Sequence, residues 1–166
     1  MQPQEQPVIS IGQLEIRYLI DTFFRRVDPI AGEVHELLAV TPPVFANLAS
    51  GAFVFPDEKS RPIAVEIASS TSAVQGDVHL TVPAGWQVTP KSVPVDLKAP
   101  NEKMFAEFSV TPPGGAGEGT LAAVVATGGK EFSFSREEIA YPHIGVHILM
   151  PAAEARVVRA DIRKTG

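Results

Sequence analysis

Two of the four histidines, His143 and His147, lie four residues apart in the stretch EIAYPHIGVHILMPAAEARVV. On a helix this spacing would place both imidazoles on one face, where they could bind zinc together. Pro142, Gly145 and Pro151 favour an extended chain instead, in which residues four apart are separated by about 13 Å. One ion cannot bridge that distance, so we predict no metal site and no cofactor. The alternative, a small metal-dependent hydrolase, requires the segment to fold back onto a third ligand from Glu137, Glu138 or His35.

The other reactive side chains form no recognisable catalytic pattern, so we predict no catalytic residue and expect that the chain is not an enzyme. The acidic pairs Asp57–Glu58 and Glu137–Glu138 are adjacent, and adjacent residues face opposite sides of a strand. The serines of ASSTSAVQGD lack the sequence of a nucleophile elbow and are interpreted as a polar loop: Ser69, Ser70 and Ser72. The absence of cysteine excludes thiol catalysis, cysteine-ligated zinc and disulfides.

The single tryptophan, Trp86, is the candidate residue for a glycan contact. It lies in TVPAGWQVTP, between two predicted strands. A sugar-stacking platform would present its ring beside other exposed aromatic side chains. The sequence shows no exposed aromatic strip, so we favour the interpretation that Trp86 closes one end of a β core while Pro83 and Gly85 shape a turn.

The elements that would position these residues are short strands. Fifteen prolines and thirteen glycines divide the chain into segments that leave little room for helices. Within the segments apolar and polar residues alternate, which indicates strands with one buried face. On this pattern we predict burial of Val65, Leu80, Val95 and Phe108. The stretch YLIDTFFRRVD fits either a helix or a strand, and we favour a strand.

The stretch LAAVVA is apolar on both faces, which predicts a central strand, and the Gly128–Gly129 pair after it predicts a two-residue hairpin. Short strands separated by turn signals every eight to twelve or so residues predict an all-β fold, an immunoglobulin-like antiparallel β-sandwich. We expect an N-terminal extension or linker over residues 1–34, the sandwich over 35–142, and a connector strand toward a following domain over 143–166.

Composition narrows the classes of partner. The chain of 166 residues is 45% hydrophobic and carries a formal net charge of −5 without a basic stripe, which argues against nucleic acid as a partner. No apolar run approaches the ~20 residues of a membrane span. The start MQPQEQPVISIGQ lacks the order of a signal peptide, and the end RVVRADIRKTG resembles an unfinished β element. We therefore expect a piece of a larger protein, whose partners are neighbouring domains of the same polypeptide and polysaccharide.

Four stretches resemble a known bacterial family: VTPPVFANLAS…VFPDEKSRPIAVEI, LTVPAGWQVTP, FSVTPPGG and IAYPHIGVHILMPAAEARVVRADI. Together they are similar to the region that follows the catalytic domain in large PIG-L (LmbE-like) deacetylases. The middle part resembles the NEW3 domain, a β-sandwich associated with carbohydrate-binding modules. The resemblance covers roughly Glu33 to Arg163.

The resemblance implies a non-catalytic accessory module of a secreted, periplasmic or cell-envelope hydrolase, acting as spacer and stabiliser and contacting carbohydrate. It also implies that an α/β domain similar to glutamine amidotransferases follows this region. The zinc motif of the deacetylases, a histidine followed by a proline and two aspartates, does not occur in this chain, so no catalytic residue carries over. A free-standing glycan-binding or adhesion module is the alternative.

Overall fold

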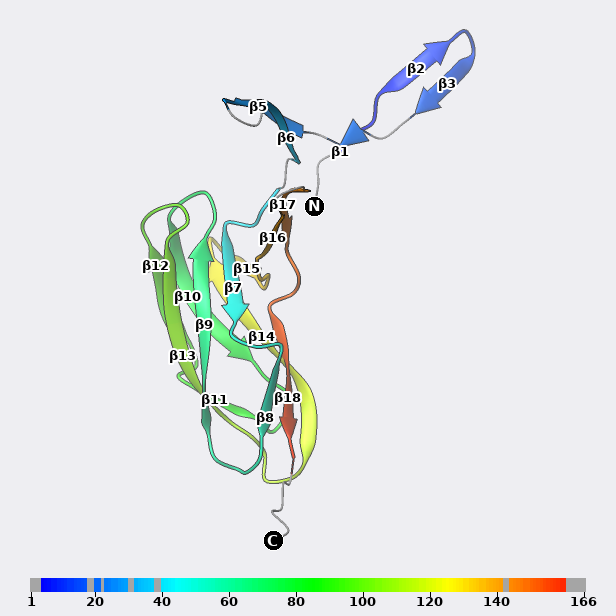
Figure 1. Cartoon of the computed structure of the whole chain (residues 1–166). Helices are drawn as coiled ribbons and strands as arrows, with labels where there is room; N and C mark the ends of the chain where they lie inside the picture. The colour runs from blue at the N-terminus through cyan, green and yellow to red at the C-terminus, as the bar shows by residue number, and fades with distance from the viewer. Residues whose placement is uncertain are drawn as a thin grey trace. The chain divides into compact units, whose positions relative to one another are not determined.

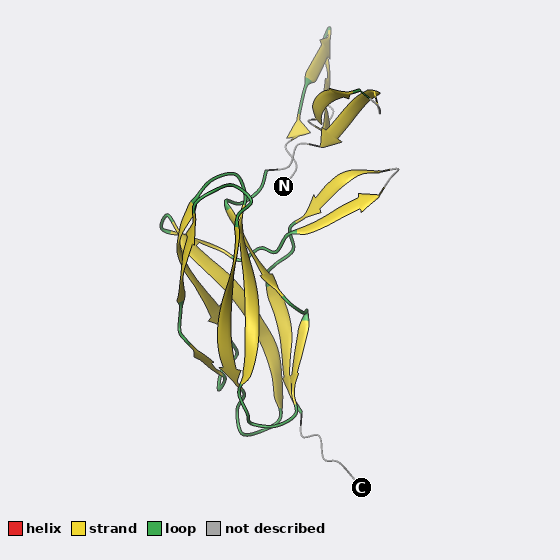
Figure 2. Cartoon of the chain, turned by 60° about the vertical axis from the view of Figure 1, so that its left-hand side comes forward, coloured by secondary structure: helices red, strands yellow, loops and turns green. Residues whose placement is uncertain are grey.

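The computed structural model describes residues 4–17, 20–21, 23–29, 32–37, 40–141 and 144–160. These ranges contain strands and no helix (Figure 2), as the spacing of prolines and glycines predicts. None of their elements is a helix that could cross a membrane. The chain divides into two compact units, one formed by Met1–Thr41 with Glu137–Leu149 and the other by Pro42–Arg136 with Met150–Gly166.

The smaller unit consists of two-stranded antiparallel sheets. The pairs are β1 (Gln4–Glu5) with β4 (Ile20–Asp21), β2 (Val8–Ile11) with β3 (Leu14–Arg17), β5 (Phe23–Asp28) with β6 (Gly32–Leu37), and β16 (Glu137–Tyr141) with β17 (Ile144–Leu149). The described part of YLIDTFFRRVD is therefore strand. Every buried apolar side chain that the structure describes belongs to the other unit.

The larger unit is a β-sandwich of two facing sheets (Figure 1). The four-stranded sheet has the order β11 (Gln87–Thr89), β13 (Lys103–Thr111), β9 (Arg61–Ser69) and β7 (Val44–Leu48). The six-stranded sheet has the order β12 (Val93–Leu97), β10 (Val74–Thr81), β14 (Gly117–Thr127), β18 (Glu154–Arg159) and β8 (Ala52–Phe55), with β15 (Lys130–Phe132) paired to β14. The all-β sandwich expected from the sequence is confirmed.

The core lies between the two sheets and follows the alternation of the sequence. The four residues chosen on that pattern are buried: Val65 and Phe108 at 0% exposure, Val95 at 2% and Leu80 at 7%. They belong to one cluster with apolar side chains from both sheets. Because full burial of such a side chain contributes about 1.5–3 kcal/mol, this cluster is the main source of stability.

The central strand and its hairpin are also as predicted. β14 pairs with β10 along one edge and with β18 and β15 along the other. The turn into β15 is formed by Gly128 and Gly129, whose φ angles of 57° and 73° lie in the left-handed region that glycine adopts at little cost.

One strand pair departs from the antiparallel expectation. β18 lies inside the six-stranded sheet, where it pairs antiparallel with β14 and parallel with β8. The chain crosses between the sheets after β7, so β8 meets the sheet in the same direction as β18. The segment expected as a connector thus supplies an internal strand of the sandwich. The division into 1–34, 35–142 and 143–166 stays a prediction about domains, and the compact units of the structure have different bounds.

The chain leaves the sandwich before β16 and returns after β17 at adjacent points. Phe134 and Ala152 form a β-bridge, and the N–H of Ser135 donates to the carbonyl of Pro151 at 2.9 Å. The N–H of Ala153 donates to the carbonyl of Ser133 at 3.0 Å. These contacts join residues 133–135 to 151–153 without any contribution from the residues between them.

Candidate functional site

Trp86 lies in the sandwich core, in agreement with the interpretation that it closes one end of a β core. It is 7% exposed, and its ring meets that of Phe55 edge to face with centroids 4.9 Å apart. The N–H of Trp86 donates to the carbonyl of Pro83 at 3.2 Å, and Gly85 has a φ of 85°, which together define a type II turn. A glycan contact through Trp86 stays a prediction, and little of this ring faces solvent.

The turn before Trp86 packs against Gly119 of β14, which has no side chain. A Cβ atom added to Gly119 of β14 would lie 2.3 Å from Cγ of Pro83, so the proline ring occupies the space of a side chain. The VPAGW stretch therefore fixes one end of the sandwich: its proline packs on β14, its glycine makes the turn, and its tryptophan fills the core.

The candidate metal ligands are only partly described. His147 is half-buried on β17 opposite Ile139, whereas His143 lies outside the described residues, so the distance between the two imidazoles stays a prediction. Glu137 and Glu138 are exposed on β16. His35 lies opposite Arg25 in the β5–β6 pair. Among the side chains that the structure describes, no three histidines and carboxylates are grouped as metal ligands.

The candidate serines and the first acidic pair are placed by structural contacts. Ser69 is buried at the end of β9, where its hydroxyl donates to the carbonyl of Ala99 at 2.6 Å and accepts the N–H of Glu102 at 3.0 Å. Ser70 is also buried, and Ser72 is exposed. Asp57 and Glu58 lie in the loop after β8 rather than in a strand, and Asp57 accepts the N–H of Lys59. Ser69 is thus a structural residue rather than a nucleophile.

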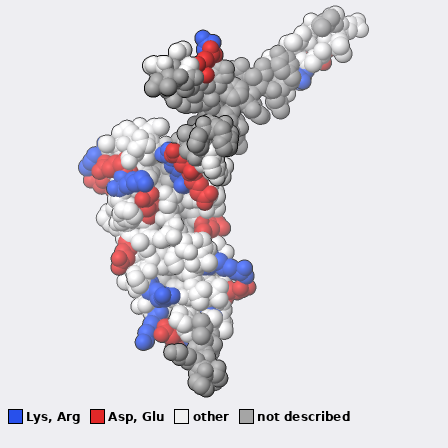
Figure 3. Space-filling view, viewed as in Figure 1, with Lys and Arg blue, Asp and Glu red and all other residues white. Residues whose placement is uncertain are grey.

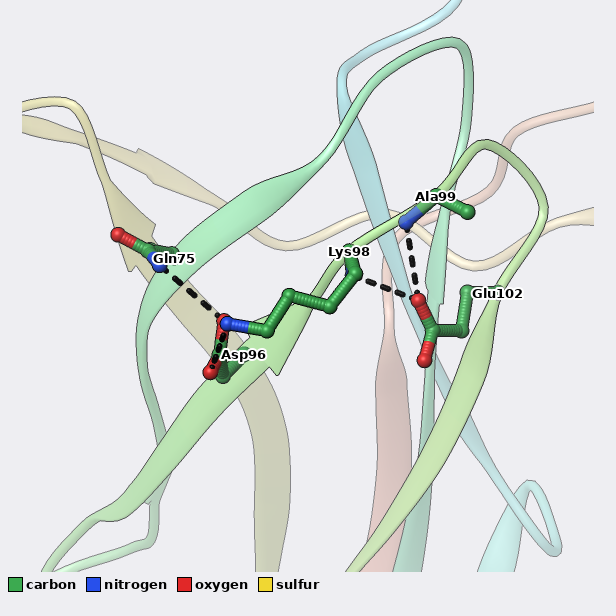
Figure 4. A network of polar contacts seen from close by, with 5 residues as sticks. All are labelled: Gln75, Asp96, Lys98, Ala99 and Glu102. Atoms are coloured by element: carbon green, nitrogen blue, oxygen red, sulfur yellow. Dashed lines mark hydrogen bonds and ion pairs between the residues drawn. The ribbon is translucent and has the colours of Figure 1, made fainter.

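The turn that Ser69 holds is shown in Figure 4. The Glu102 carboxylate accepts the N–H groups of Lys98 at 2.6 Å and Ala99 at 2.9 Å. Pro100 precedes Asn101, whose φ of 59° fits the third position of a type II turn closed from Glu102 to Ala99. The carboxylate therefore satisfies backbone donors, and this turn is a rigid connection between β12 and β13.

A second carboxylate in the same view is held by side chains. The Lys98 ammonium lies 2.5 Å from Asp96, and the amide of Gln75 donates to the other oxygen of Asp96 at 3.2 Å. The hydrogen bond from Lys98, followed by that from Gln75, holds the pKa of Asp96 below its usual range. On the face shown in Figure 3 acidic and basic side chains are interspersed rather than gathered by sign.

Phe105 is an exposed aromatic residue that the sequence interpretation did not single out. It is 70% exposed on β13, on the outer face of the four-stranded sheet, between Lys103 and Glu107 along the strand. The alternation that buries Ala106 and Phe108 also places Phe105 outside, so the signal was available in the sequence. The small residues Ala64 and Pro62 on the neighbouring β9 are exposed as well.

Beside Phe105 lies an ordered polar group. Glu66 of β9 is directly opposite Phe105, and its carboxylate binds the Lys103 ammonium at 3.1 Å and the Asn47 amide at 3.2 Å. Asn47 in turn accepts the N–H of Arg136 at 2.8 Å. Burial acts to raise the pKa of Glu66, but the hydrogen bonds from Lys103 and Asn47 outweigh it and leave that pKa lowered. Phe105 thus stands next to fixed hydrogen-bonding groups.

Comparison with known proteins gives one family match. Residues 61–127 match the family described as the NPCBM-associated NEW3 domain of alpha-galactosidase, a range that contains β9 to β14. This supports the NEW3-type sandwich predicted from the sequence. No curated protein matches the chain.

Two similar solved structures are much longer proteins. A Salmonella alpha-2-macroglobulin mutant shares 18% identity at a TM-score of 0.48, with 77% of this chain and 7% of that chain covered. The native conformation of the E. coli alpha-2-macroglobulin shares 17% identity at a TM-score of 0.47, with 78% and 7% covered. The chain spans a small part of the length of both proteins.

Proposed function

We propose that this chain is a non-catalytic accessory β-sandwich of a secreted or envelope bacterial hydrolase, where it serves as spacer and stabiliser and contacts carbohydrate. The observation that carries the proposal is the match of β9 to β14 to a domain described from alpha-galactosidase, a carbohydrate-active enzyme. The resemblance of the segment from Tyr141 to Ala155 to PIG-L-linked proteins further favours a deacetylase of that type as the parent. Neighbouring domains of the same polypeptide are then its main partners.

The polar side chains of the sandwich agree with an accessory role. Ser69, Asp96 and Glu102 each bind groups of the adjoining strands and turn. Such contacts connect neighbouring strands and a turn of the sandwich, which suits a module whose role is structural. The activity of the whole protein would lie in another domain.

A second function, a free-standing glycan-binding module, is favoured by Phe105. An aromatic ring that is 70% exposed beside an ordered carboxylate and ammonium offers an apolar surface for the C–H face of a sugar and partners for its hydroxyl groups. A single ring predicts weak binding. The accessory sandwich and the glycan-binding module therefore differ in the affinity for glycan that they predict and in the surface that makes the contact.

The experiment is a paired assay of the intact chain. Acetate release from N-acetylglucosamine derivatives, with zinc or another divalent metal added, should not exceed a control without protein. Calorimetric titration with glycan oligomers should give weak binding. Acetate release above the control would contradict the accessory proposal.

Two variants assign any binding to a surface. Phe105→Ala should abolish a contact on the outer face, while Trp86→Phe, which keeps an aromatic ring in the core, should leave it unchanged. Ser109→Ala on the same face of β13 is the matched control. Tight binding lost in Phe105→Ala would promote the glycan-binding module over the spacer, and tight binding lost only in Trp86→Phe would establish the contact predicted from the sequence.

A further inference from the structure

The chain joins the sandwich at one end, where β7 begins, and leaves it at the other, where β18 ends (Figure 1). At the first end Val44 pairs with Ser69, the last residue of β9. At the second end the N–H of Ala160 donates to the carbonyl of Phe55 in β8. Arg61, the first residue of β9, also contacts β8, through the carbonyl of Val54. The two ends are thus separated by the length of β9, about 30 Å at the rise of a strand.

Both terminal strands are held along their length. β18 lies between β14, with which it pairs from Glu154 to Arg159, and β8, with which it pairs from Arg156 to Arg159. β7 pairs with β9 from Val44 to Leu48, and on its other side the N–H of Ala46 donates to the carbonyl of Phe134. β18 is therefore an internal strand, while β7 is the edge strand of its sheet with one further hydrogen bond on its outer side.

This arrangement decides how the sandwich responds to tension between its two ends. A pull at residue 42 acts along β7 and away from the sandwich, while a pull at residue 160 acts along β18 in the opposite sense. Ladder hydrogen bonds lie across the strands, so such a pull shears them and many must break together. When two neighbouring strands are instead pulled apart at one end of their pairing, the hydrogen bonds between them break one after another.

We propose that the sandwich has a mechanical function, to transmit tension between the parts of the polypeptide that it joins without unfolding. This mechanical function rests on the proposed spacer function, and it requires that the sandwich stay folded while force acts on its two ends. The internal position of β18 is central to it, because the last strand of the sandwich is held by two neighbours instead of one.

The test is single-molecule force spectroscopy with attachment at engineered cysteines, which are unique handles because the chain contains no cysteine. The first double variant, Val40→Cys with Ala160→Cys, pulls the two ends apart in shear. The second, Val40→Cys with Ser72→Cys, pulls β7 and β9 apart from the end where Val44 pairs with Ser69. Both variants keep every strand residue and should melt at the temperature of the unaltered chain.

At equal loading rate the end-to-end variant should unfold at a severalfold higher force than the second variant, because forced unfolding reports the barrier along the direction pulled. Equal forces, or a lower force in the end-to-end variant, would overturn the proposal. The paired assay of acetate release and glycan titration is independent of these forces, so a failure of the accessory function and a failure of the mechanical one are distinguishable.

Discussion

Single polar residues do structural work in this chain, and Ser69 is the clearest case. The sequence presents it as one of several serines in a polar loop. Its hydroxyl instead connects β9 to a turn 30 to 33 residues later in the chain, by bonds to Ala99 and Glu102. That contact depends on how the strands pack, so the local sequence could not reveal it.

Ser69→Ala should destabilise the sandwich by about 1–3 kcal/mol, because it leaves the carbonyl of Ala99 and the N–H of Glu102 without this hydroxyl in a part-buried site. Urea unfolding followed by tryptophan fluorescence measures the change. The control Ser109→Ala, on an exposed position of β13, should change stability by less than about 0.5 kcal/mol. Equal effects of the two changes would contradict the assigned role.

Glu66 predicts a dependence of stability on pH. Its pKa is lowered in the folded chain, so the ionised carboxylate stabilises the fold above the unfolded pKa of about 4.3, and this contribution is lost as pH falls through the lower folded pKa. Glu66→Gln should therefore cost about 0.5–1 kcal/mol at pH 7, a value limited by the exposure of Lys103, and less at pH 3.

The measurement is the urea midpoint of both proteins at the two pH values, with Glu107→Gln, on the neighbouring strand β13, as control. A difference between Glu66→Gln and the unaltered chain that stays constant or grows toward pH 3 would contradict the assigned role of the ion pair.

At the scale of the element, local rules predicted most strands and turns because each depends on neighbours in sequence. Alternation identified the buried face at Val65 and Phe108, and the glycine pair identified the β14–β15 hairpin. The same alternation places Phe105 on the outer face, next in sequence to the buried Ala106. The position of β18 between β14 and β8 depends on long-range pairing that no local pattern encodes.

Gly119→Ala should destabilise by about 1–3 kcal/mol, because the new methyl group would overlap Pro83 and displace the turn before Trp86. Gly117→Ala on the same strand is the matched control, since nothing lies within 4 Å of its added Cβ. Thermal melting of both variants measures the difference. If Gly117→Ala were the more destabilising change, the packing of Pro83 on β14 would not explain the glycine.

In the whole molecule, two stretches of chain that are separated in sequence form the sandwich: Pro42–Arg136 and Met150–Gly166. β18 contributes Ala155 and Val157 to the buried interior, at 2% and 0% exposure, although it follows the β16–β17 hairpin. The family match ends at residue 127, before β15 and β18. The folding unit is therefore larger than the matched range.

Replacement of Glu137–Leu149 by Gly-Ser-Gly should leave a folded sandwich, with Tm changed by no more than about 4 °C, because residues 133–135 and 151–153 already bind each other. Truncation after residue 142 should abolish the cooperative transition, since it removes β18. Calorimetric melting distinguishes the two. A cooperative transition in the truncated chain, or none in the linker variant, would show that the sandwich is built differently.

We propose above that this sandwich is an accessory part of a larger hydrolase. The most direct measurement is the complete coding sequence of the polypeptide that contains it, with the mass of the native protein as a check. We expect a single polypeptide in which a deacetylase domain, marked by a histidine followed by a proline and two aspartates, precedes this chain. A polypeptide that carries no hydrolase domain beside the sandwich would contradict it.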